Sequence, residues 1–150
     1  MKLFGRKEQK TFEKEFRVVG KMTCVATDES RCRDWKRNMD YMGWKDVELC
    51  FGDPVGNEDD LEMMVHQYEL AISNEKEIEA QLLTDHRVSY LTKEGEPPLD
   101  KDAKVQMCLH AKDYDGNIHP YVELSYETGD KYIWIAIEDG KFFVFTDGKV

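Results

Sequence analysis

The stretch AKDYDGNIHPYVELSY, residues 111–126, decides the fold, because it reads either as a calcium loop or as the turn of a β-hairpin. An EF-hand loop needs oxygen ligands at its first, third and fifth positions, glycine at the sixth and glutamate at the twelfth. Counted from Asp113, Gly116 is fourth and Glu123 is eleventh. The spacing therefore favours the hairpin, and the sequence predicts no metal site here.

A two-residue turn centred on Asp115 and Gly116 gives the hairpin a definite register, since Asp-Gly tolerates the positive φ that such turns need. On one face the register places apolar residues opposite one another: Val105 and Tyr126, Met107 and Leu124, Leu109 and Val122, Ala111 and Pro120. On the other face it pairs mostly polar residues: Gln106 and Ser125, Cys108 and Glu123, His110 and Tyr121, Lys112 and His119. A slip of one residue would mix the two faces.

The same pattern continues to the C-terminal end as a four-stranded antiparallel meander. Its predicted strands are residues 104–112, 118–126, 131–138 and 141–146. A turn at Thr128-Gly129 would set Leu124 opposite Ile133. A turn at Asp139-Gly140 would set Ile137 opposite Phe142.

The sequence pattern of the N-terminal half predicts strands followed by helices. Alternating residues from Phe12 to Ala26 indicate one long strand, bent at Gly20. Residues 35–51 suit a hairpin turning near Met42-Gly43, with a short helix at 31–42 as the alternative.

Asn57 is a predicted helix cap, with carboxylates in the turn that follows. Asn74 offers a second helix start, with Glu77 completing a capping box, so the segment is either two helices or one kinked helix. The predicted fold class is therefore α+β: a largely antiparallel sheet with one or two helices on a face. Residues 1–11 form a basic leader and residues 12–150 a single domain.

Composition limits the classes of partner. The net charge of −10 disfavours binding to nucleic acid or to an anionic membrane and suits a basic partner. No apolar run approaches a membrane span, and the first residues have no hydrophobic signal core, so the expected location is the cytoplasm. Oligomeric state is left open.

Chemical motifs give little support for an enzyme. The sequence contains no phosphate loop, no dinucleotide fingerprint, no H-E-x-x-H and no G-x-S-x-G. The four cysteines form no C-x-x-C pair and are expected to be reduced thiols. Cys108, His110 and Glu123 share a sheet face and include the parts of a nucleophile and its base. Polar neighbours are common on a half-exposed sheet, so we predict no catalytic residue, no cofactor and no metal.

The two faces of the meander differ in a way that bears on function. One face is aliphatic and is expected to pack against the helices. The other face carries aromatic residues beside polar ones: Tyr121, Tyr132, Trp134, Phe143 and Phe145, with His110, His119 and Glu123. Such a face suits binding, unless the first three strands cover it as a second layer or the sheet curls round it.

Two stretches carry a resemblance to known domains. DWKRNMDYMGWKDVELCF, residues 34–51, and YETGDKYIWIAI, residues 126–137, resemble the opening and closing hairpins of a group of small bacterial domains. Some of these domains look like immunity proteins, which neutralise a toxin by binding it. The resemblance implies an acidic binding protein.

The sequence therefore yields two functional hypotheses. The first is a non-catalytic protein-binding domain, immunity-like, whose acidic run meets a basic partner through Asp53, Glu58, Asp59, Asp60 and Glu62. The second is a small enzyme or ligand-binding domain that uses the aromatic face around His110, Glu123 and Trp134. Tyr121, on the same face, is a further candidate binding residue.

Overall fold

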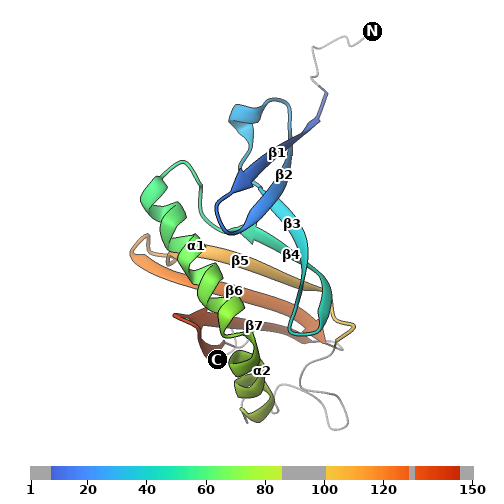
Figure 1. The fold of residues 1–150 in the computed structure, drawn as a ribbon, viewed down its shortest axis with the longest axis vertical. Coiled ribbons are helices and arrows are strands. Elements are labelled where there is room, and N and C mark those ends of the chain that lie inside the picture. The colour runs from blue at the N-terminus through green and yellow to red at the C-terminus, as the bar shows by residue number, and fades with distance from the viewer. Residues whose placement is uncertain (1–7, 86–100, 129–130, 146–150) are drawn as a thin grey trace.

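The computed structural model describes residues 8–85, 101–128 and 131–145. Within these residues, eight strands form one sheet whose spatial order follows the chain order, β1 to β8. The strands are β1 (Lys10–Phe16), β2 (Gly20–Ala26), β3 (Lys36–Tyr41), β4 (Trp44–Phe51), β5 (Val105–Lys112), β6 (Ile118–Thr128), β7 (Lys131–Glu138) and β8 (Lys141–Phe145). A short 3-10 helix (Glu29–Arg31) precedes β3, while α1 (Glu58–Ser73) and α2 (Glu75–Thr84) lie between β4 and β5. The predicted α+β class and the C-terminal meander are confirmed (Figure 1).

The sheet consists of two antiparallel halves joined by one parallel pair. β4 runs parallel to β5, with Leu49 opposite Met107 and Phe51 opposite Leu109. The other neighbouring pairs are antiparallel. We call the β4–β5 pair the parallel seam. It arises because both helices intervene between these strands, and a parallel pair needs such a crossover.

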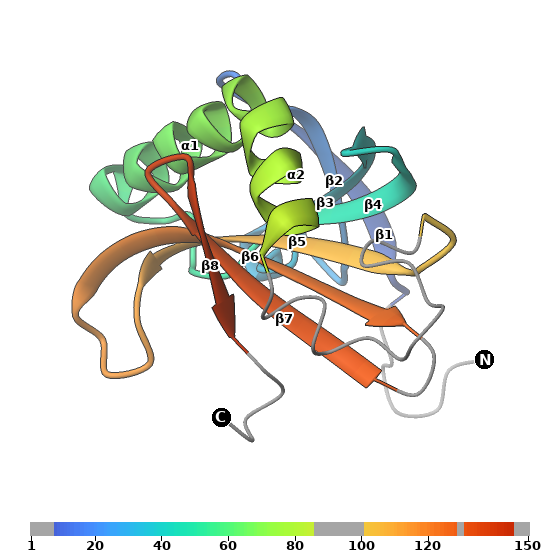
Figure 2. The same cartoon turned by 90° about the horizontal axis from the view of Figure 1, so that it is seen from below.

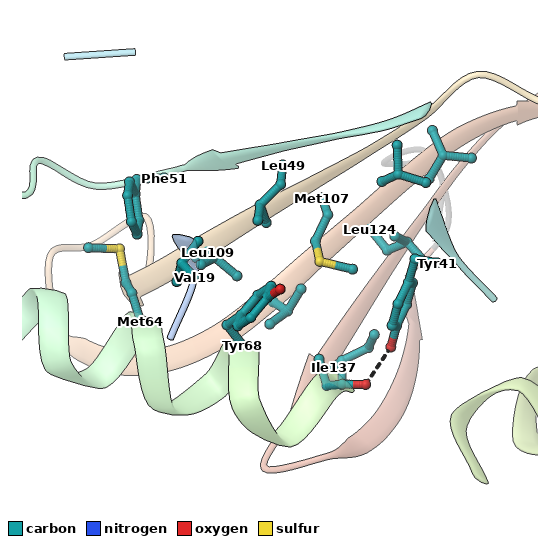
Figure 3. Close-up of a cluster of buried hydrophobic side chains, with 14 of the residues drawn as sticks. Val19, Tyr41, Leu49, Phe51, Met64, Tyr68, Met107, Leu109, Leu124 and Ile137 are labelled. Atoms are coloured by element: carbon teal, nitrogen blue, oxygen red, sulfur yellow. Dashed lines mark hydrogen bonds between the residues drawn. The ribbon is translucent and has the colours of Figure 1, made fainter. Parts of the chain in front are cut away.

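Both helices lie on the same side of the sheet (Figure 2). Met64 and Tyr68 of α1 point towards the strands, where Leu49, Met107 and Leu109 are fully buried (Figure 3). Burying each such side chain is worth about 1.5–3 kcal/mol. The aliphatic face of the meander therefore packs against the helices, as the alternation of residues predicts.

Hydrogen bonds from Tyr41 and Asp139 help to attach α1 to the sheet. The Tyr41 hydroxyl donates to the Ala71 carbonyl at 2.8 Å (Figure 3). The Gln67 side chain donates to the Asp139 carboxylate at 2.8 Å and accepts from its backbone amide at 2.9 Å. These bonds fix the helix over β3 and over the β7–β8 turn.

Helix boundaries follow the sequence with one difference. Asn57 caps α1, accepting from the amides of Asp59 and Asp60, as predicted. A second helix does begin after Asn74. The Asn74 side chain makes no capping bond, however, and instead donates to the Leu70 carbonyl at 2.8 Å. The predicted capping box is therefore wrong, although two helices are present.

Three sequence predictions need correction in the first half and at the hairpin tip. Residues 12–26 do not form one strand but the β1–β2 hairpin, because Val18 and Gly20 adopt positive φ of 70° and 96°. The alternative helix at 31–42 is wrong, since residues 36–41 are a strand. Lys112 lies opposite Ile118 rather than His119.

The hairpin turns explain that shift. In the β5–β6 turn only Gly116, not Asp115, has positive φ, and the Asp113 amide donates to the Asn117 carbonyl. The loop is therefore one residue longer than a two-residue turn, and a bulge restores the predicted register from His110 inwards. At Asp139-Gly140 both φ are positive, so that predicted turn is confirmed.

The β6–β7 pairing differs by two residues from the prediction. Leu124 lies opposite Ile135, not Ile133, since the strands run on to the Thr128–Lys131 pair. A shift of two preserves the face of every side chain. The two-layer expectation for the aromatic face is also wrong, because β1–β3 continue the same sheet.

Some predictions fall partly outside the described residues. β1 begins at Lys10, inside the predicted leader, and residues 1–7 are not described. The side chains of Tyr132, Phe143 and Phe145 are also outside the described part. No described helix is long and apolar enough to cross a membrane.

Candidate functional site

The candidate site lies on the sheet face opposite the helices. Met107, Leu109 and Val122 are buried on the face that packs against the helices. Because successive strand residues point to opposite faces, the residues next to them in sequence point to the other face. That side receives three groups of side chains: Gln106, Cys108 and His110 from β5, Tyr121 and Glu123 from β6, and Trp134, Ala136 and Glu138 from β7. The structure thus brings together the four face residues that the sequence singled out: His110, Tyr121, Glu123 and Trp134.

His110 is held on three sides. Its Nε2 lies 2.9 Å from Glu123 Oε2, and its ring stacks on Tyr121 with centroids 4.6 Å apart. A Cβ added at Gly52 would collide with the ring, so the absence of a side chain there makes room for the imidazole. The bond to Glu123, the stacking on Tyr121 and the close approach of Gly52 together fix the orientation of the ring.

A pocket of about 280 Å³ is lined by Tyr121, the residue on which the His110 ring stacks. Tyr114, from the loop of the β5–β6 hairpin, leans over Trp134 with ring centroids 6.2 Å apart. The described residues that line the pocket are Asp113, Tyr114, His119, Tyr121, Trp134, Ala136 and Glu138. Three aromatic rings and two carboxylates therefore surround one concave site, which we call the aromatic pocket.

The polar groups of the aromatic pocket are ordered by local bonds. His119 Nε2 lies 2.8 Å from Glu138 Oε1. Asp113 Oδ1 accepts from the amides of Asp115 at 2.9 Å and Asn117 at 3.0 Å, which shapes the loop that carries Tyr114. This carboxylate thus has the turn role that the sequence favoured over a calcium loop.

Tyr121 stays a neutral phenol over the physiological range. Burial raises its pKa to about 12, and the nearby negative charge of Glu123 acts in the same direction. A neutral phenol can donate a hydrogen bond and offers an electron-rich ring to a cation.

The predicted trio of Cys108, His110 and Glu123 divides into two separate pairs. His110 is bonded to Glu123, while Cys108 Sγ lies 2.8 Å from Cys50 Sγ on β4. The Cys50 contact and burial raise the pKa of Cys108 well above its usual range. Cys108 therefore carries its proton in the resting state and is not a thiolate activated by His110.

The acidic run does not form one exposed patch. Asp53 accepts from the backbone amides of Ala111 at 2.6 Å and Lys112 at 3.1 Å. Asp60 is buried, and its carboxylate lies 3.3 Å from the Lys112 ammonium. Both aspartates thus hold the end of β5 next to the hairpin loop that carries Asp113 and Tyr114 of the aromatic pocket.

The remaining members of the run face solvent. Glu58 and Asp59 are exposed in the first turn of α1, and Glu62 pairs with Arg17 at 2.6 Å. Glu58 and Asp59 are therefore the part of the run best placed to meet a partner.

Sequence reasoning missed several contributors to this face. Cys50 lies on β4 and Gly52 directly follows that strand, and only the parallel seam brings them beside β5. Tyr114 falls within the predicted turn, and a tyrosine in a tight hairpin loop beside an aromatic strand is a signal that such a turn borders a pocket. Within residues 8–85, 101–128 and 131–145, no cluster of three or more metal-ligating side chains is present.

Comparison of the chain with family models, with curated proteins and with solved structures finds no match in any of the three.

Proposed function

We propose that this chain is a non-catalytic protein-binding domain that takes a cationic side chain of a basic partner into the aromatic pocket. The observation that carries the proposal is the lining itself: the rings of Tyr114, Tyr121 and Trp134 together with the carboxylates of Asp113 and Glu138. Aromatic rings attract a lysine or arginine head group within about 6 Å of the ring centroid, by about 0.5–1 kcal/mol at exposed sites. The carboxylates add a charge of the right sign.

The charge of the whole chain supports the same class of partner. A net charge of −10 draws a basic protein towards the surface and repels acidic ones. The exposed pair Glu58 and Asp59 would contribute to that attraction without touching the pocket. The proposed function belongs to the immunity-like class that the resemblance implies, with the aromatic pocket as its binding site.

The enzyme hypothesis receives less support from the geometry. The described lining of the aromatic pocket contains neither His110 nor Glu123. These two residues form their own pair behind Tyr121, and the protonated Cys108 is paired with Cys50. A nucleophile activated by a base, which acyl or glycosyl transfer would need, is therefore not assembled there.

A peptide titration followed by NMR tests the proposal. The probe is the peptide acetyl-Gly-Lys-Gly-Lys-Gly-amide, and its control is the same peptide with norleucine in place of lysine. Trp35 and Trp44 are buried in the core, so the indole signal of Trp134 reports on the pocket. We expect the lysine peptide to shift that signal saturably and the norleucine peptide to have little effect.

Matched variants locate the site. Tyr114 is 86% exposed, so Tyr114→Ala should leave the fold intact and weaken binding by about two- to fivefold. Glu138→Gln should also weaken it, whereas Glu69→Gln, the same change on an exposed position of α1, should not.

Two results would contradict the proposal. Equal binding of the two peptides would make the pocket an apolar site. Loss of binding in Glu58→Lys with Asp59→Lys, without loss in Tyr114→Ala, would place the site on the acidic run.

A further inference from the structure

Two thiols face each other across the parallel seam. Cys50 of β4 and Cys108 of β5 are register partners, so their side chains leave the sheet side by side on the same face. Neighbouring strands lie about 4.7–4.9 Å apart, which is inside the Cα separation of about 4.4–6.8 Å that a disulfide spans. The sulfur atoms are 2.8 Å apart, less than about 1 Å beyond the S–S bond length of about 2.05 Å.

The surroundings of the two sulfurs differ in a way that suits stepwise oxidation. The two sulfurs share a hydrogen bond, and this contact lowers the pKa of Cys50 and raises that of Cys108. Cys50 is thus the better thiolate and Cys108 the thiol held beside it. Cys50 is buried with 7% of its surface exposed, while Cys108 is more accessible, so a small oxidant can approach the pair from solvent.

We propose that Cys50 and Cys108 are a redox modification site that converts reversibly between a dithiol and a disulfide, with hydrogen peroxide as the class of oxidant. The Cys50 thiolate attacks one peroxide oxygen, the O–O bond breaks, and a sulfenic acid forms while hydroxide takes up a proton and leaves as water. The Cys108 sulfur then attacks the sulfenic sulfur, the S–O bond breaks, and the Cys108 proton leaves with the hydroxyl group as a second water. Two thiols and one peroxide thus become one disulfide and two waters.

The position of the pair gives the modification a structural effect. The parallel seam joins the half formed by β1–β4 to the half formed by β5–β8. A bond between Cys50 and Cys108 would make that junction covalent and close a long chain loop containing both helices. Closing a long loop restricts the unfolded chain and stabilises the folded one. The disulfide would therefore hold the two halves of the sheet together and stabilise the folded protein.

The second cysteine pair provides an internal comparison. Cys24 and Cys32 are both buried, and burial with the Cys24 contact raises the pKa of Cys32 to about 11. Both sulfurs are buried and the Cys32 thiol holds its proton more tightly, so this pair should react more slowly with peroxide. The difference in rate between the two pairs is part of the test.

Mass spectrometry of the wild-type chain can identify the bond without any substitution. Cleavage after lysine and arginine places the four cysteines in four different peptides. After limited peroxide treatment we expect a loss of two hydrogen masses, a linked peptide pair containing Cys50 and Cys108, and free thiols at Cys24 and Cys32. Reduction with dithiothreitol should restore both peptides.

Melting curves supply the second measurement. The oxidised wild type should melt several degrees above the reduced form, and Cys108→Ser should abolish that shift. Cys24→Ser with Cys32→Ser should keep it; if that variant fails to fold, the peptide map of the wild type still decides the question. Survival of both thiols, oxidation of either one to a sulfinic acid without a disulfide, or a bond that joins either sulfur to another cysteine would overturn the proposal.

Discussion

Tyr41 and Tyr126 are buried phenols whose protonation is linked to folding. Burial raises the pKa of both above the value of about 10 that tyrosine has in an unfolded chain. The protonated phenols therefore contribute stability that is complete below about pH 10 and is lost as pH rises through the folded-state pKa values. Above pH 10 each group should lower the free energy of unfolding by up to about 1.4 kcal/mol per pH unit.

Urea denaturation between pH 8 and pH 11 measures this loss. Tyr41→Phe should lower stability at pH 8, because a buried hydrogen bond to Ala71 disappears, yet it should make the decline above pH 10 less steep. Tyr114→Phe is the matched control, since Tyr114 is exposed. An unchanged slope in Tyr41→Phe would show that this phenol is not linked to alkaline unfolding.

Gly52 determines where the His110 ring can lie. A methyl group at Gly52 would collide with the imidazole, forcing it away from Glu123 and from the Tyr121 ring. We expect Gly52→Ala to cost about 1–3 kcal/mol, as overpacking usually does. Gly56→Ala is the control, because a Cβ there would have no neighbour within 4 Å. Equal stability of the two variants would show that the ring moves at no cost.

At the scale of single elements, α1 depends on its first turn. Asn57 accepts from the amides of Asp59 at 2.9 Å and Asp60 at 3.2 Å, which satisfies donors that a helix start otherwise leaves unpaired. Asn57→Ala should therefore cost about 1 kcal/mol in chemical denaturation. Asn38→Ala, at an exposed position of β3, should cost much less. A loss no larger than that of Asn38→Ala would show that the cap contributes nothing.

Local elements were largely predictable from the sequence because their causes are local. The β5–β6 register followed from matching apolar residues across the hairpin, and the Asp139-Gly140 turn followed from residues that tolerate positive φ. The errors lie where two local patterns are equally good. The β6–β7 register is off by two because a shift of two leaves each side chain on its face.

The candidate site was predictable only where one hairpin builds it. His110, Tyr121 and Glu123 face one another within β5 and β6, so their grouping followed from the register. The parallel seam joins residues far apart in the chain, and no short pattern encodes it. For that reason the Cys50–Cys108 contact and the place of Gly52 beneath His110 could not be predicted.

At the scale of the whole molecule, charge should govern how fast a basic partner associates. We expect the association rate to fall as salt rises, and Glu58→Lys with Asp59→Lys to lower it by about tenfold or more at low salt. Asp60 is left unchanged in this test because it is buried beside Lys112. Tyr114→Ala should instead raise the dissociation rate, since it removes a contact made only after docking.

Stopped-flow mixing with a basic protein that the wild type captures, and that Tyr114→Ala binds more weakly, would measure both rates. A charge-reversed variant that associates as fast as the wild type would show that steering by these carboxylates plays no part. A salt-independent rate would lead to the same conclusion.

The parallel seam also sets the order in which the chain can fold. Neighbouring strands in each half are neighbours in the chain, so their hairpins can close early at small entropic cost. β4 and β5 can pair only after the chain between Phe51 and Val105 has folded back to bring the two strands together. Docking of two preformed halves around α1 is therefore the expected last event. In φ-value experiments, Leu49→Ala should mainly accelerate unfolding, whereas Leu124→Ala, within the meander, should also slow folding.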